Sequence, residues 1–479
     1  MRPLALLATS ALLLHPLPVP AAEPLARTIE RVVDRPAFAP AFWGIEVRSL
    51  ASGRVLYARN AGKNFRPAST LKLVTTAAAL DALGPDARFR TTVETTARLD
   101  GLGRILGDVY LVGRGDPNLS GRFAPDGNVR APLEGLAEAL RGAGVLQIEG
   151  RVVGHEGAFT GERRGADWGW EDLTWSYGAE VSALSFNDNA VELRLAPGEL
   201  PGDPAMLEAR PPSSYYSVDC QVTTTSPRVK RDLTLVRESG NRIRLRGSLP
   251  KGEIWEGRVA LEDPARYATT VFAEVLEARG VRVGGGVATS SDPLPAESRV
   301  LAAHDSLPLA EALAVVNKES QNLHTELLLR VLGQRLKGEG SVAAGHEAIR
   351  AFLARIGVPA EAWGLQDGSG LSRSDLLSPH GLVALLVAMD RHPHAAAFRG
   401  SLAVMGVDGT LKHRLRATRA EGRVLAKTGT LRGANALAGY LTTLKGERLA
   451  FAIVVNNHTV PGRDAIVAID DVVRGLVAR

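Results

Sequence analysis

Hydrophobic and polar positions near both ends of the chain follow the periods of one α+β domain. Apolar residues three and four positions apart predict helices, and alternation of apolar with polar residues predicts strands. The expected terminal helices cover residues 25–33 and 464–477, and the expected strands cover residues 42–48, 54–57, 423–426, 434–443 and 449–456. Because these strands come from both chain ends and are joined by short turns, we predict a five-stranded antiparallel sheet covered by helices.

A further helix is predicted from Pro67 to about Leu83, where Gly84 and Pro85 stop it. It is apolar on nearly all sides and should therefore be buried. More helices are expected in the stretch before the C-terminal strands, over residues 307–316, 322–336, 343–356 and 382–389. They should back the same sheet.

Residues from about 88 to 298 have a sequence pattern unlike that of the chain ends. They consist of short β-rich runs separated by frequent turn residues. They are therefore expected to interrupt the α+β domain. We expect that domain over residues 22–87 and 299–479, an inserted domain over residues 88–194 and 259–298, and a nested second insertion over residues 195–258.

A weak internal echo lies inside the interrupting segment. Residues 136–145 resemble residues 272–281, and each run reads as a helix that ends at glycine and leads into a strand. Two similar units would bracket one inserted domain, although so common a unit also recurs by coincidence.

The composition is that of a soluble globular protein, with 479 residues, of which 45% are hydrophobic and 23% are charged. This length predicts two or three domains. Arg2, the apolar run over residues 4–14 and the small residues ending at Ala21 predict a signal peptide over residues 1–21, with a buried N-terminal helix as the alternative. The single cysteine, Cys220, excludes an internal disulfide.

The net charge of +5 suits anionic envelope polymers or peripheral association with a membrane leaflet. Aromatic residues make up only 5% of the chain, and no basic stripe is interleaved with them, so we expect no nucleic-acid partner. The sequence does not determine the oligomeric state.

Three short motifs, far apart in the chain, carry the residue types of serine acyl transfer. They are Ser69-Thr70-Leu71-Lys72, Ser320-Gln321-Asn322 and Lys427-Thr428-Gly429. Each pattern is weak alone, because Ser248-Leu249-Pro250-Lys251 and Ser185-Phe186-Asn187 also fit the first two. The first of these lies in a predicted turn and the second in a β-like stretch, so neither has the expected setting.

Ser69 and Lys72 lie three positions apart at the start of the apolar helix, so their side chains share one helix face. A serine hydroxyl needs a nearby base to act as a nucleophile. Lys72 is that base only when neutral, and burial or a second cation nearby would lower its pKa. The alternative is a helix-capping serine followed by a solvated lysine, which the apolar surroundings disfavour.

The other two motifs supply proton transfer and substrate binding. Ser320 and Asn322 should lie in a loop between helices, where Ser320 would pass a proton to a leaving amine and Asn322 would bind Lys72 and a substrate amide. Alternatively, Ser320 is a plain helix cap.

Lys427 and Thr428 should lie at the end of a strand and offer a cation and a hydroxyl to a terminal carboxylate. Gly429 would leave room for an extended substrate peptide. The N–H groups of Ser69 and Thr430 are candidates for an oxyanion hole. The alternative here is a turn at the strand end with a solvated lysine.

With these motifs the chain resembles the D-alanyl-D-alanine carboxypeptidase/endopeptidase family, the type 4 group of class C low-molecular-mass penicillin-binding proteins. Further stretches that resemble the family are Gly107–Leu111, Gly115–Leu119, Asp367–Arg373, Ser378-Pro379 and Gly406–Leu411. The resemblance implies a penicillin-recognising serine transpeptidase/β-lactamase-like fold with nested insertions. It also implies a periplasmic enzyme that acts on peptidoglycan stem peptides.

The resemblance further implies a role for each motif residue. Ser69 would be acylated, Lys72 would take its proton, Ser320 and Asn322 would assist proton transfer, and Lys427 and Thr428 would hold the terminal carboxylate. β-Lactams would acylate Ser69 as inhibitors, and no metal or organic cofactor would be needed.

Two alternatives share these motifs: a serine β-lactamase, and a non-catalytic protein that binds the cell wall or senses β-lactams. Against the first, no Glu-x-x-Leu-Asn run supplies the deacylating base of a class A β-lactamase. Against the second, Ser69 and Lys72 are intact. The sequence does not decide between carboxypeptidase and endopeptidase preference.

Overall fold

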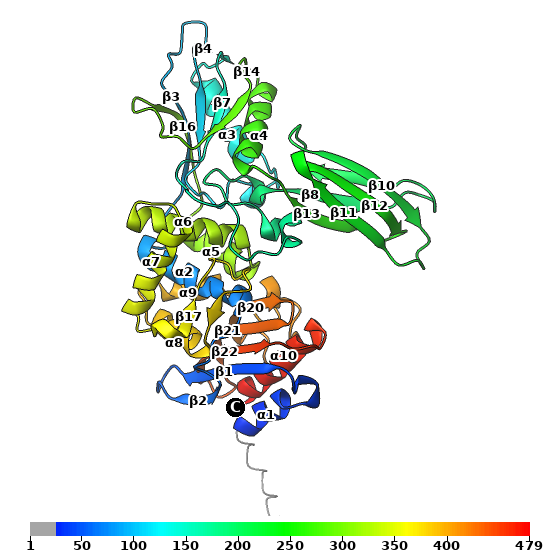
Figure 1. Ribbon diagram of the computed structural model, residues 1–479, viewed down its shortest axis with the longest axis vertical. Coiled ribbons are helices and arrows are strands. Elements are labelled where there is room, and N and C mark those ends of the chain that lie inside the picture. The colour runs from blue at the N-terminus through cyan, green and yellow to red at the C-terminus, as the bar shows by residue number, and fades with distance from the viewer. Residues whose placement is uncertain (1–24) are drawn as a thin grey trace, which may run out of the picture.

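The computed structural model describes residues 25–479, so the expected signal peptide lies outside the described residues. The lower part of the molecule is built around an antiparallel sheet with strand order β19-β20-β21-β22-β1-β2 (Figure 1). These strands are β1 (Phe42–Ser49), β2 (Val55–Arg59), β19 (Ala403–Val404), β20 (Val424–Leu431), β21 (Ala434–Thr442) and β22 (Arg448–Asn456). All five predicted strands are present, and the two-residue β19 extends the sheet at one edge.

Both faces of this sheet are buried, as the apolar character of β22 requires. Ala450, Ala452 and Val454 face one hydrophobic cluster, and the alternating residues Phe451, Ile453 and Val455 face another. The second cluster is closed by the terminal helices α1 (Leu25–Val33) and α10 (Gly462–Ala478), as predicted.

The first cluster is closed by the helical layer from the middle of the chain. Its helices are α2 (Lys72–Leu83), α5 (Leu309–Lys318), α6 (Asn322–Lys337), α7 (Val342–Arg355), α8 (Pro379–Asp390) and α9 (Ala395–Ser401). The expected helices in this region are therefore present within a few residues. Helix α2 is buried along most of its length, from Lys72 to Leu80, which its all-round apolar sequence predicts.

The upper part of the molecule has a hydrophobic cluster of its own, formed by residues between Val93 and Ala302 (Figure 1). Its larger sheet has the order β15-β7-β5-β3-β16. The strands are β3 (Arg90–Thr95), β5 (Val109–Val112), β7 (Val152–His155), β15 (Val287–Ser290) and β16 (Arg299–Asp305). Strand β16 pairs with β3, so this sheet extends past residue 298, where we expected the α+β domain to resume.

The internal echo corresponds to two helix–strand units that lie together. Helix α3 (Ala131–Gly142) leads into β6 (Gln147–Ile148), and α4 (Pro264–Ala278) leads into β14 (Arg282–Val283). The two helices contact each other, and β14 pairs in parallel with β6. A third strand, β4 (Arg104–Ile105), also pairs with β6 in parallel.

A narrow wing of strands projects to one side of the upper part (Figure 1). Its two sheets have the orders β13-β8-β9 and β10-β12-β11. The strands are β8 (Ala190–Ala196), β9 (Met206–Arg210), β10 (Ser217–Thr225), β11 (Asp232–Glu238), β12 (Arg242–Pro250) and β13 (Trp255–Ala260). Ser248, which we placed in a turn, lies inside β12, and Ser185–Asn187, which we read as β-like, lies in a loop before the turn Asn187–Asn189.

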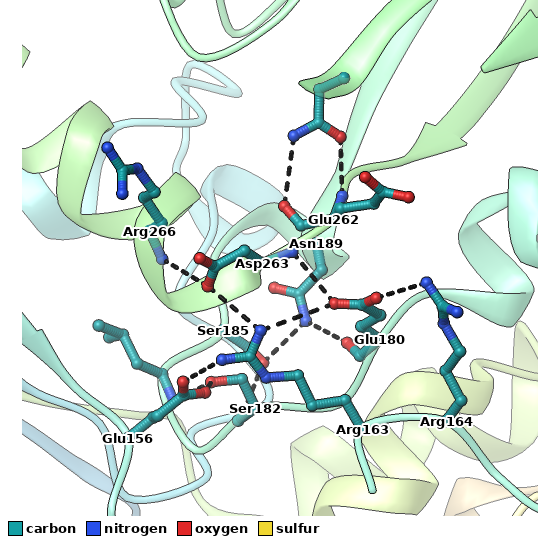
Figure 2. A network of polar contacts seen from close by, with 12 residues as sticks. Glu156, Arg163, Arg164, Glu180, Ser182, Ser185, Asn189, Glu262, Asp263 and Arg266 are labelled. Atoms are coloured by element: carbon teal, nitrogen blue, oxygen red, sulfur yellow. Dashed lines mark hydrogen bonds and ion pairs between the residues drawn. The ribbon is translucent and has the colours of Figure 1, made fainter. Parts of the chain in front are cut away.

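A polar network joins the loop over residues 156–189 to the start of α4 (Figure 2). The Arg163 guanidinium pairs with Glu156, with Glu180 and with Asp263, the residue that caps α4. Ser182 donates a 2.6 Å hydrogen bond to Glu156. This network ties the loop to the start of α4. No helix within residues 25–479 has the length and apolar character needed to cross a bilayer.

Candidate active site

Ser69 lies in a tight turn, Ala68–Leu71, directly before helix α2. Ala68 adopts a left-handed backbone with φ of 47°, a conformation that costs about 1–2 kcal/mol for a non-glycine residue. Two glycines allow other segments to pack against this turn. A Cβ atom on Gly429 would lie 2.6 Å from the Pro67 carbonyl oxygen, and one on Gly370 would collide with the Ala68 carbonyl. The strain is therefore held in place by β20 on one side and by the loop around Gly370 on the other.

Lys72, the first residue of α2, is completely buried and has three partners. Its Nζ atom lies 3.0 Å from Ser69 Oγ, 2.6 Å from Asn322 Oδ1 and 2.6 Å from the Ser369 carbonyl oxygen. The amide and carbonyl oxygens can only accept hydrogen bonds, whereas the serine hydroxyl can also donate. A neutral amine, with two N–H groups and one lone pair, satisfies all three partners when its lone pair accepts the Ser69 proton.

Burial lowers the pKa of Lys72 from 10.5 to about 8. The acidic groups of Asp367, Glu326 and Asp375 act in the opposite direction, but burial outweighs them. Burial also raises the pKa of Glu326 to about 7 and that of Asp375 to about 10, and the negative charge of Asp367 adds to both. Both carboxyl groups therefore hold a proton more readily than free carboxyl groups do, which weakens their support for a charged Lys72.

Ser320 and Asn322 lie where α5 ends and α6 begins, as predicted. Ser320 has a positive φ of 65°, a second strained position at this site. The Asn322 Nδ2 atom donates a 2.8 Å hydrogen bond to the Tyr177 carbonyl, while its Oδ1 atom faces Lys72. These two contacts fix the orientation of the side-chain amide, and its second N–H is free for a substrate.

Lys427 is buried inside β20, and the third motif lies within that strand. Its Nζ atom donates 2.9 Å hydrogen bonds to Ser320 Oγ and to the Thr428 carbonyl. Burial lowers the pKa of Lys427 well below 10.5, and the positive charge of Lys72 lowers it further. A charged Lys427 would have one N–H left for a ligand. A carboxylate bound there would raise this pKa again.

Residues of the first two motifs and Thr430, which follows the third, surround one cavity of about 970 Å³. Ser69, Ser320, Asn322 and Thr430 all line it. The structure therefore brings together every predicted site residue, because Lys72, Lys427, Thr428 and Gly429 lie directly beside these four. The opposite wall comes from the upper part of the molecule and includes Asp172 and Tyr177. A 3.3 Å ion pair joins Asp172 to Arg373 across this wall.

Several residues of the site have no motif of their own. Thr410 contacts Thr428 through a 2.9 Å hydroxyl–hydroxyl hydrogen bond, and Lys318 pairs with Asp408 beside it. Ser369 acts through its backbone carbonyl, which no sequence pattern reveals. Thr410 and Ser369 lie in stretches that we identified by resemblance without a role.

Asp188 is a buried hub that links the upper part of the molecule to the Ser320 loop. Its carboxylate lies 2.8 Å from His324 Nε2, 2.6 Å from Arg122 Nη2 and 2.9 Å from Arg258 Nη1. Arg122 also pairs with Glu319, the residue before Ser320. Burial alone would raise the pKa of Asp188, but these cations lower it well below 3.8.

A serine in a strained turn beside a buried lysine, with a second buried lysine on β20 close by, defines the active site of a penicillin-recognising serine hydrolase. The chain belongs to the D-Ala-D-Ala carboxypeptidase 3 (S13) family, whose sequence model matches residues 25–476. It is 36% identical over 437 residues to the D-alanyl-D-alanine carboxypeptidase of Actinomadura sp. (strain R39), covering 88% of this chain and 79% of that protein.

Solved structures share the fold. Penicillin binding protein 4 (dacB) from Haemophilus influenzae aligns with a TM-score of 0.81 and 24% identity over 94% of this chain and 98% of that one. The penicillin G-acylated Bd3459 predatory endopeptidase from Bdellovibrio bacteriovorus aligns with a TM-score of 0.52 and 16% identity over 91% of each chain. The predicted family, fold and serine-hydrolase class are confirmed, and the family favours a carboxypeptidase over the two alternatives.

Proposed function

We propose that Ser69 attacks the carbonyl of the penultimate D-alanine in a peptidoglycan stem peptide and expels the terminal D-alanine. Water then releases the trimmed peptide from Ser69. The observation that carries this proposal is the 3.0 Å contact between Ser69 Oγ and the buried Lys72 amine, at a cavity that Ser320 and Asn322 also line.

Proton transfer in this proposal begins at Lys72. The neutral amine takes the Ser69 proton as the new C–O bond forms, and the amide nitrogen of the leaving D-alanine takes up a proton as the C–N bond breaks. Ser320 is suited to deliver that second proton, because its hydroxyl accepts a hydrogen bond from Lys427 and keeps its own proton for the leaving group. The proton that Lys72 took from Ser69 would then pass to Ser320, so that Lys72 is neutral and Ser320 is a hydroxyl again.

The substrate would lie along β20. A terminal carboxylate fits against Lys427, which would regain its positive charge, and the Thr428 hydroxyl. The N–H groups of Ser69 and Thr430 would bind the oxyanion that forms at the attacked carbonyl. Glycine at position 429 is also required for packing, because a side chain there would collide with the Pro67 carbonyl.

We extend the proposal to D,D-endopeptidase activity and to β-lactams as acylating inhibitors. In an endopeptidase reaction the leaving group is a cross-linking diamino acid rather than free D-alanine. The penicillin G-acylated endopeptidase with the same fold supports both extensions. The predicted signal peptide supports action in the periplasm.

We also propose that both chain ends, residues 22–87 and 299–479 without strand β16, form the catalytic domain. The separate hydrophobic cluster between Val93 and Ala302 supports an inserted domain over residues 88–194 and 259–298, to which β16 is added because it pairs with β3. The wing strands β10–β12 support a nested unit within residues 195–258.

The replacement Ser69→Ala tests the proposed nucleophile. The measurement is D-alanine release from a pentapeptide ending in D-Ala-D-Ala. We expect Ser69→Ala to be slower by at least about a thousandfold, because it removes the attacking oxygen. Ser248→Ala is the matched control, since Ser248 belongs to the second S-x-x-K pattern and lies in β12. Near-normal release by Ser69→Ala would contradict the assignment.

A further inference from the structure

A second cavity, of about 810 Å³, opens beside the catalytic one. Tyr177 lines both cavities. The second cavity is lined by the small sheet β13-β8-β9 and by the segment Trp175–Tyr177, which adjoins this sheet where Trp175 pairs with Val259 of β13. Asn322 of the catalytic site bonds the Tyr177 carbonyl, so this one residue separates the two cavities and touches both.

The sheet presents a regular pattern of charges to this cavity. Arg258, Glu192 and Arg210 are cross-strand neighbours in one row, and Glu256, Arg194 and Glu208 form the next row. All six line the cavity because residues two apart on a strand share a face. Each charge has an opposite charge directly beside it on the neighbouring strand.

This charge pattern indicates which kind of ligand the cavity would bind. Three arginines balance three glutamates, so the face as a whole attracts neither cations nor anions. Close ion pairs join Arg194 to Glu256 at 3.4 Å and Arg258 to Glu192 at 3.3 Å. A guanidinium has five N–H groups and a carboxylate has about four acceptor positions, so each paired group keeps donors or acceptors for the cavity.

The aromatic residues that line the same cavity narrow the choice of ligand. The side chains of Trp175 and Tyr177 each combine an apolar ring face with a polar N–H or O–H group. Aromatic rings beside dense, neutralised donors and acceptors suit a polyhydroxylated ring with apolar C–H faces. The best match is therefore an uncharged saccharide.

The direction of the proposed substrate agrees with this match. With its terminal carboxylate at Lys427 and Thr428 and its scissile carbonyl at Ser69, the peptide would leave on its amino side past Asn322, the proposed partner of a substrate amide. Asn322 bonds Tyr177, which lines both cavities. In peptidoglycan the amino end of the stem peptide is joined to an N-acetylated amino sugar. The intervening three residues span about 10 Å when extended.

We propose that the cavity beneath Trp175 and Tyr177 binds the N-acetylated disaccharide to which the stem peptide is attached. This proposal rests on the proposed function, because it takes the substrate direction from it. The site would make the enzyme prefer peptides still attached to wall glycan.

The test compares two substrates by kcat/KM for D-alanine release. One is an N-acetylated pentapeptide without sugar, and the other is the same peptide on the N-acetylated disaccharide. We expect the wild type to favour the disaccharide substrate by about tenfold or more. Arg194→Ala and Glu208→Ala should lose most of this preference, and neither residue lines the catalytic cavity.

Arg231→Ala is the matched control, because it removes an equally exposed arginine from an ion pair with Glu253 outside the cavity. It should keep the full preference. Equal kcat/KM values for the two substrates in the wild type, or an unchanged preference in both cavity variants, would overturn the proposal. A loss in Arg194→Ala that is specific to a sugar-free cross-linked peptide would overturn it in favour of a peptide site.

Failure of the proposed function has a different signature, namely no D-alanine from either substrate. Saccharide binding is then measured by calorimetry with the free disaccharide, which does not depend on turnover. The wild type and Arg231→Ala should bind it and Arg194→Ala should not. Absence of binding to the wild type would overturn the inference.

Discussion

At the residue scale, the chemistry depends on a lysine whose neutral form becomes accessible near physiological pH because burial lowers its pKa to about 8. Lys72 faces two groups that only accept hydrogen bonds and one hydroxyl that can donate. Burial also lowers the pKa of Lys427. Its ammonium form would have one N–H left beyond the bonds to Ser320 and the Thr428 carbonyl, and a carboxylate bound there would restore the positive charge. Two lysines in one site therefore have opposite proposed roles, a proton acceptor and an anion binder.

The first prediction concerns the pH dependence of acylation. Because the Lys72 pKa is lowered to about 8, the reactive neutral form increases as the pH rises through that value. The second-order rate constant for acylation by penicillin G should rise nearly tenfold from about pH 6 to about pH 7 and level off above about pH 9. A rate that is independent of pH across this range would contradict Lys72 as the base.

Lys72→Arg provides the companion variant. Arginine keeps the positive charge but stays protonated at every accessible pH. Acylation should therefore fall by at least about a thousandfold and should lose the rise near pH 8. A variant that acylates at a normal rate would show that charge, and not proton acceptance, is what position 72 supplies.

At the element scale, the nucleophile turn is held between β20 and the loop around Gly370, and the Ser320 loop is held by Asp188. The strands and helices of this framework could be predicted because their apolar residues are periodic. The contacts between them could not. Ser369 uses a backbone carbonyl, and Asp188 is 136 residues from His324 in sequence, so no local pattern points to either.

Gly429→Ala tests how closely β20 supports the turn. The new Cβ would lie 2.6 Å from the Pro67 carbonyl and 3.2 Å from Ala68 Cβ, so the turn must shift away from β20. We expect kcat for D-alanine release to fall by about tenfold or more, since a misplacement of about 1 Å is costly at a reacting group. Gly135→Ala, on the exposed side of α3, is the control, because its Cβ meets nothing within 4 Å. Equal kcat values for the two variants would argue against this support.

Asp188→Asn tests the hub. The change leaves Arg122, Arg258 and His324 around an uncharged group, and breaking a buried ion pair of this kind costs about 3–5 kcal/mol in the free energy of unfolding. Loosening of the Arg122–Glu319 contact should also lower kcat. Denaturant unfolding and D-alanine release are the two measurements.

Asp219→Asn is the control for the hub, because Asp219 pairs with Arg246 on the exposed surface of the wing. It should leave both stability and kcat close to those of the wild type. If Asp188→Asn behaved in the same way, the carboxylate would not be the link between the two parts of the molecule.

At the scale of the whole molecule, sequences from both chain ends meet in one sheet, and the intervening segment builds a second body with its own core (Figure 1). From the short β-rich runs and frequent turn residues we predicted that the first body is interrupted between about residues 88 and 298. The sequence did not reveal that β16 pairs with β3 before the chain continues into the helical layer. A short strand with alternating apolar residues is compatible with either sheet.

This arrangement predicts that residues 88–305 fold alone. Their two ends lie on the adjacent strands β3 and β16, and their hydrophobic cluster is separate from the two clusters below. The isolated fragment should show a cooperative thermal transition by circular dichroism. A fragment without such a transition would show that its core needs the catalytic domain.

The central claim is that Ser69 is the residue that becomes acylated. Peptide-mapping mass spectrometry after incubation with penicillin G tests it most directly, because the adduct reports the attacking atom whatever the natural substrate. We predict a single penicilloyl group, located on Ser69 and absent from Ser69→Ala. An adduct on Ser320 or on another residue, or a protein that gains no mass, would contradict the claim.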